Sequence, residues 1–113
     1  MERIIAIDFD GTIVEQSYPE MGKLKENAKR VINRLFDEGN TIIIWTVRSH
    51  SDNALKSMKN LLDHEGIKYH KINENADSFL RTDYSPKVYA DIYIDDRQIG
   101  GLPTWNEIDK LIG

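Results

Sequence analysis

Short, continuous apolar runs that end abruptly in acidic or hydroxyl side chains constrain the fold of this chain most strongly. They occupy residues 3–7, 41–45 and 91–94, and a weaker run lies at 67–72. Apolar runs of this length, without strict polar alternation, are typical of strands buried on both faces of a parallel sheet. The sequence therefore predicts a sheet that is covered on both sides.

The segments between these runs have the spacing of amphipathic helices. In residues 23–38, apolar side chains recur three or four positions apart, and Gly39 follows as a stop. A second helix is predicted from near Ser51 to a stop at Gly66, and a short third helix at 105–112.

Strands that alternate with helices predict an α/β domain. We expect a three-layer α/β/α sandwich with a mainly parallel, Rossmann-like sheet and no cap domain. The chain has 113 residues, which suits a single domain over residues 1–113.

Composition excludes several classes of protein. Fifteen basic and nineteen acidic residues give a net charge of −4, which argues against a broad surface for duplex nucleic acid. The absence of cysteine excludes disulfides and thiolate metal sites. No apolar run approaches the ~18 residues of a membrane span, and the N-terminal run is too short for a signal peptide. We therefore expect a cytoplasmic protein that binds neither duplexes nor membranes.

Polar side chains that can take part in catalysis or metal binding follow three of the predicted strands. They are Asp8, Asp10, Thr46, Arg48, Asp95 and Asp96. In parallel sheets, ligands bind beyond the carboxyl ends of the strands, and strand ends far apart in sequence become neighbours there. The fold is therefore expected to gather four carboxylates, a hydroxyl and a guanidinium at one edge.

The four carboxylates predict a metal site. Asp8 and Asp10 are two residues apart, so they lie on the same side of an extended chain and repel one another unless a cation lies between them. One can act as nucleophile and metal ligand, and the other as general acid and base. Together with Asp95 and Asp96 they form an oxygen-only set that suits Mg²⁺.

Two further side chains suit a phosphoryl group. Thr46 offers a hydroxyl and Lys87 an ammonium to phosphate oxygens. An attacking carboxylate, a metal, a hydroxyl and a lysine together serve phosphoryl transfer. Lys71 and Arg81 are alternatives to Lys87, and Thr46 alone is equally suited to capping the next helix.

Alternatives also stay open for residues near these strand ends. Arg48 and Arg97 either contact a substrate phosphate or sugar, or pair with the acidic cluster. Tyr18 and Pro19, in the loop that follows the first strand, are candidates for substrate contact, and His50 is a candidate to line the entrance.

These motifs resemble those of the haloacid dehalogenase (HAD) superfamily of phosphohydrolases. The family motif DxDx[TV] after a hydrophobic strand is similar to DFDGT at 8–12. A hydroxyl residue after the second strand, an upstream lysine and a late acidic pair are matched by Thr46, Lys87, Asp95 and Asp96.

The resemblance implies a Mg²⁺-dependent phosphatase with a role for each matched position. Asp8 would be the nucleophile that forms an aspartyl-phosphate and also a metal ligand. Asp10 would be the general acid and base, with its backbone carbonyl on Mg²⁺. Asp95 would complete the metal site with support from Asp96, and the matched hydroxyl and lysine would bind the phosphoryl group.

Most members of this superfamily carry a cap domain, whereas here residues 12–23 and 49–87 leave room only for a short flap and a few elements. A capless member implies an open site, for a phosphorylated small molecule or the phosphorylated end of a macromolecule, or a homo-oligomer in which a neighbouring subunit supplies the cap. The sequences TVRS and DDR are also similar to those of polynucleotide 3′-phosphatase domains of the superfamily. That activity and a non-catalytic phosphate-binding regulatory module are the alternatives.

Overall fold

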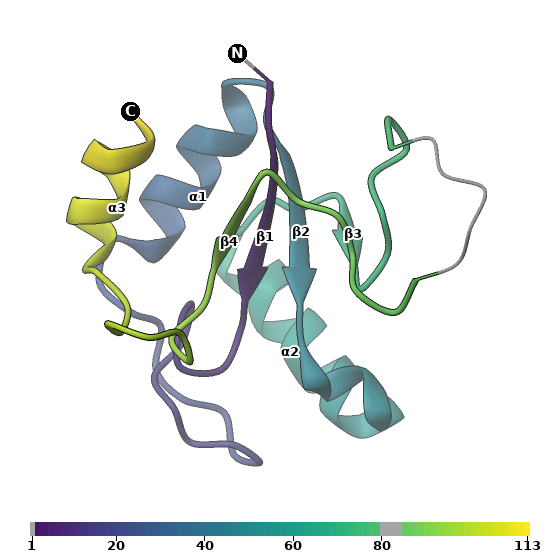
Figure 1. Cartoon of the computed structure of the whole chain (residues 1–113). Helices are drawn as coiled ribbons and strands as arrows, with labels where there is room; N and C mark the ends of the chain where they lie inside the picture. The colour runs from purple at the N-terminus through teal and green to yellow at the C-terminus, as the bar shows by residue number, and fades with distance from the viewer. Residues whose placement is uncertain (1, 80–84) are drawn as a thin grey trace.

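The protein is described by a computed structural model, which covers residues 2–79 and 85–113. Strands alternate with helices along most of the chain (Figure 1). The elements are β1 (Ile4–Asp8), α1 (Ala28–Asp37), β2 (Thr41–Trp45), a 3₁₀ turn η1 (Val47–His50), α2 (Asp52–Glu65), β3 (Lys71–Ile72), β4 (Ile92–Ile94) and α3 (Trp105–Ile112).

The four strands form one parallel sheet in the order β3-β2-β1-β4. The central strand is β1, in which Ile7 lies opposite Ile44 of β2 on one side and Ile94 of β4 on the other. All carboxyl ends therefore point to the same edge of the sheet. This register brings the residue after Ile7 and the residue after Ile94 to the same level.

Both faces of the sheet are covered, which explains why the strands are apolar at consecutive positions. Ile5 and Ile7 of β1 belong to the main core, together with buried side chains of α1, α2 and α3, so the three helices cover one face. Ala6 points to the opposite face, where Val88 and Ala90 pack against it.

The predicted fold class is confirmed. The protein is a layered α/β domain with an all-parallel, Rossmann-like sheet and, over residues 2–79 and 85–113, no cap domain. The third layer differs in detail from the expected one, because within the described residues it is the irregular segment around Val88 and Ala90 rather than a helix. None of the helices in the described part of the chain combines the length and the apolar character needed to cross a membrane.

The first helix begins later than the predicted span of 23–38. It starts at Ala28, after Asn27, whose φ of 67° is left-handed. Leu24, which the helical pattern included, instead pairs with Val14 in an antiparallel bridge. The apolar spacing was real, but Leu24 reaches the core from an extended segment, so a local period could not separate the two conformations.

This bridge closes a short hairpin loop over residues 15–23, which we call the flap. The amide of Glu15 donates to the carbonyl of Lys23 at 2.8 Å. A side chain at Gly22 would clash, because its Cβ would lie 1.9 Å from the Glu15 carbonyl oxygen. The side chains of residues 15–20 are exposed, whereas Met21 at the end of the flap packs against the main core.

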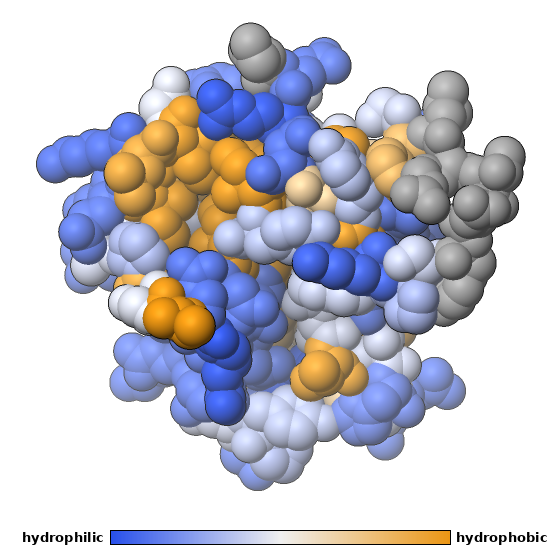
Figure 2. All heavy atoms as spheres, in the orientation of Figure 1, coloured by the Kyte–Doolittle hydropathy of each residue, from blue (hydrophilic) through white to orange (hydrophobic). Residues whose placement is uncertain are grey.

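The edge strand β4 is flanked by an apolar surface. A shallow depression of about 160 Å³ lies between β4 and α3. Its apolar lining includes Ile92, Leu102, Ile108 and Leu111. Figure 2 shows apolar side chains gathered on this side of the molecule, next to the helix α3 of Figure 1.

Candidate functional site

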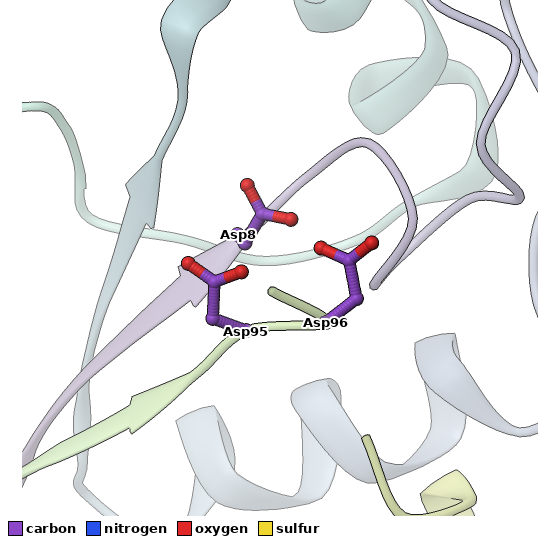
Figure 3. A group of neighbouring side chains, drawn as sticks. All are labelled: Asp8, Asp95 and Asp96. Carbon is purple, nitrogen blue, oxygen red and sulfur yellow. The ribbon is translucent and has the colours of Figure 1, made fainter. Parts of the chain in front are cut away.

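Three carboxylates meet where β1 and β4 end. Asp8 is the last residue of β1, and Asp95 and Asp96 directly follow β4. Each offers an oxygen within 4.8 Å of the other two. Figure 3 shows the three side chains converging from these two neighbouring chain segments. Three of the four carboxylates predicted as metal ligands are thus brought together.

The cluster strongly perturbs Asp8. Burial, followed by the negative charges of Asp95 and Asp96, raises the pKa of Asp8 to about 8, against a lowering contribution from a hydrogen bond donated by Thr12. Three carboxylates this close are mutually unfavourable without a cation. Asp96 Oδ1 is buried and lacks a hydrogen-bond partner among the described residues. An oxygen-only donor set with one buried, unsatisfied oxygen fits a hard divalent cation such as Mg²⁺.

Thr12 links Asp8 to Asp96 through two hydrogen bonds. Its buried hydroxyl donates to Asp8 Oδ2 at 3.0 Å and accepts from the backbone amide of Asp96 at 3.0 Å. Its carbonyl accepts from Trp105 Nε1 at 2.9 Å, which anchors the turn to α3. Thr12 was not predicted as a site residue, although its place as the last residue of the DFDGT motif was an available signal.

Gly11 allows the close approach of the two strand ends. Its φ of +86° is left-handed, and a Cβ there would lie 2.2 Å from Asp96 Oδ2. Any side chain at this position would therefore collide with the carboxylate of Asp96 and strain the backbone.

Asp10 does not join the group of three with its side chain. Both of its carboxylate oxygens accept hydrogen bonds from Arg48, from Nε and Nη2 at 2.8 Å each. This ion pair is buried, with 1% of Arg48 and 8% of Asp10 exposed. Arg48 was predicted either to contact substrate or to pair with an acidic residue, and in the structure it pairs with Asp10. Arg97 is exposed, with its Nε 4.0 Å from Asp96.

The structure therefore does not support the prediction that the Asp10 carboxylate is a metal ligand, because both of its oxygens accept hydrogen bonds from the Arg48 guanidinium. The role that the resemblance implied for Asp10 on the metal concerns its backbone carbonyl, and that role stays a prediction.

Thr46 lies at the end of β2, as expected, and is nearly buried. Its hydroxyl accepts from the amide of Arg48 at 3.0 Å and so caps η1. Asn73 holds its backbone from both sides, accepting from Thr46 N at 2.8 Å and donating to Thr46 O at 2.7 Å. The hydroxyl hydrogen of Thr46 is not used in this cap, so the side chain can still donate to a ligand. Asn73 was not predicted as a site residue, although its place directly after the third strand was an available signal.

Lys87 lies beside Tyr93, whose side chain packs against the buried cluster around Ala6. Its ammonium is 4.8 Å from the centroid of the Tyr93 ring, and Tyr93 comes two residues before Asp95. Lys71 is instead engaged with Asp77 at 3.0 Å. The other alternative, Arg81, lies outside the described residues.

Comparison with known proteins places the chain in a family. No model of a known protein family matches the sequence, and no curated protein matches it. A solved structure of a conserved protein from Bacteroides thetaiotaomicron superposes on it with a TM-score of 0.88 and 33% sequence identity. The chain belongs to the same family as this Bacteroides protein. The match covers 99% of this chain and 90% of the Bacteroides protein, so the similarity extends over the whole domain rather than over one motif.

Proposed function

We propose that the protein is a Mg²⁺-dependent phosphomonoester hydrolase of the HAD type, with Asp8 as its nucleophile. The observation that carries the proposal is the convergence of Asp8, Asp95 and Asp96 within 4.8 Å at the carboxyl edge of a parallel sheet. The resemblance of DFDGT and IDD to the superfamily motifs supports the same assignment. A cytoplasmic location, expected from the cysteine-free composition, belongs to this proposal as well.

In this mechanism an Asp8 carboxylate oxygen attacks phosphorus, a new P–O bond forms, and the bond to the leaving alcohol breaks. In its protonated form, the Asp10 side chain would deliver its proton to the leaving oxygen, and the resulting carboxylate would later remove a proton from the water that cleaves the aspartyl-phosphate. Thr46 and Lys87 bind the phosphoryl oxygens. Asp8, Asp95 and Asp96 would hold a bound Mg²⁺, which would neutralise negative charge on the carboxylates and the phosphoryl group.

Phosphate release from a panel of phosphomonoesters tests the proposal. The panel holds sugar phosphates, nucleotides and 3′-phosphorylated oligonucleotides, each assayed with Mg²⁺ and with a chelator. The variant Asp8→Asn removes the nucleophile, and Asp77→Asn is the matched control, because Asp77 is exposed at 91% outside the cluster. We expect Mg²⁺-dependent turnover by the wild type and Asp77→Asn, and none by Asp8→Asn.

Turnover that survives in Asp8→Asn would refute the assigned nucleophile. Mg²⁺ binding without turnover of any ester would favour a phosphate-binding module. A strict preference for the oligonucleotides would favour a 3′-phosphatase. We do not favour the 3′-phosphatase, because Arg48, one of the residues that suggested it, is buried against Asp10.

A further inference from the structure

Arg48 is the most unusual side chain near the site, because it is charged and yet only 1% exposed. A buried guanidinium is tolerated only where its donors are satisfied. Nε and Nη2 donate to the Asp10 carboxylate at 2.8 Å, and Nη2 also donates to the carbonyl of Glu20 at 3.0 Å. The rings of Phe9 and Tyr18 lie 5.6 and 5.0 Å from its central carbon.

These contacts join three segments that are distant in sequence. Asp10 belongs to the turn after β1, Glu20 and Tyr18 belong to the flap, and Arg48 itself belongs to η1. A second link between the flap and η1 is the contact of the Tyr18 hydroxyl with His50 Nε2 at 3.1 Å. Of the residues in these contacts, Arg48 is the one that binds both the flap and Asp10.

The flap depends on such contacts for its position. The side chains of residues 15–20 are exposed, so the apolar burial that holds this loop comes from Met21, which packs partly buried against the main core. Segments with few buried contacts open at low free energy unless specific polar contacts restrain them. The guanidinium that holds Asp10 also supplies such a contact to the flap.

We propose that Arg48 is a positioning residue that fixes the Asp10 carboxylate and the flap as one unit. Loss of either contact loosens the other, because both depend on one rigid, planar donor group. The consequence for turnover rests on the proposed function, in which Asp10 carries the proton. The link between the flap and Asp10 does not rest on it.

Hydrogen–deuterium exchange of the flap amides tests this link directly. Arg48→Lys keeps the charge but cannot offer the same three fixed N–H groups. We expect exchange at the Glu15 amide, which donates to the Lys23 carbonyl at the base of the flap, to rise about tenfold, while the amides of β1 and β2 keep their protection. Arg30→Lys is the matched control, because Arg30 pairs with Asp109 on the surface of α1, and exchange of the flap should not change.

Asp10→Asn provides the reciprocal test and does not remove the arginine. The loss of the bidentate partner should loosen Arg48 and raise exchange of the flap, although no flap side chain has been altered. Unchanged exchange of the flap in folded Arg48→Lys, or in Asp10→Asn if the former does not fold, would overturn the proposal. This readout needs no turnover, so an inactive wild type would count against the proposed function alone.

Kinetics then separate positioning from a merely structural role. In an active enzyme, Arg48→Lys should lower kcat about 10- to 100-fold with KM changed by less than about threefold. A residue that acts through Asp10 adds nothing once Asp10 is gone, so Arg48→Lys/Asp10→Asn should match Asp10→Asn in kcat. Effects that multiply in the double variant would contradict the assigned role.

Discussion

Replacing Asp8 by Asn should stabilise the metal-free protein at alkaline pH. Burial and the neighbouring Asp95 and Asp96 raise the pKa of Asp8 from 3.8 to about 8. Because the folded-state pKa exceeds the unfolded value, this group stabilises the fold fully below pH 3.8, and that contribution is lost as pH rises through 8. At pH 8 to 9 the wild type therefore pays an electrostatic penalty that Asn avoids.

The magnitude follows from the shift. About four pKa units at about 1.4 kcal/mol each give an upper bound of roughly 6 kcal/mol. Asp8 is only half-buried, so solvent screening reduces this value, and we expect about 2 kcal/mol. For a domain of this size, that difference raises Tm by roughly 8 °C.

Thermal unfolding in a chelator, at pH 3.5 and at pH 8.5, measures the effect. Asp8→Asn should melt well above the wild type at pH 8.5, whereas at pH 3.5 the two should nearly coincide, because Asp8 is then protonated in the folded and the unfolded protein alike. Added Mg²⁺ should raise the Tm of the wild type at pH 8.5 and raise that of Asp8→Asn much less. The exposed control Asp77→Asn should follow the wild type throughout. A Tm of Asp8→Asn at or below that of the wild type at pH 8.5 would refute the reasoning about the cluster.

Two further substitutions probe the geometry around the carboxylates. Gly11→Ala should lower the free energy of unfolding by at least about 2 kcal/mol in urea titrations, because of the φ of +86° and the clash with Asp96, and equal stability would contradict the close approach. Thr12→Val keeps the shape but removes the tie between Asp8 and Asp96, so it should cost about 1–3 kcal/mol. Calorimetric titration should also show weaker Mg²⁺ binding by Thr12→Val, and an unchanged affinity would exclude a role for Thr12 in shaping the site.

The fold was largely predictable because its signals are local. Consecutive apolar residues in β1 and β2 require cover on both faces, and Gly66 ends α2 with a φ of 70°, as its place after the helical pattern predicted. The start of α1 was not predictable, because Leu24 satisfies a helical period while it pairs with Val14. The spacing of apolar residues indicates which side chains are buried, but not whether a helix or an extended segment buries them.

The sequence by itself determined the parallel sheet and the placement of Asp8, Asp95 and Asp96, because residues that follow buried parallel strands must meet at one edge. Only the tertiary structure decided the partner of Asp10. Its carboxylate lies two residues from Asp8, yet it turns to Arg48, which is 38 positions away. The partner of a buried charge depends on which distant segments pack around it, and no local pattern in the chain carries that information.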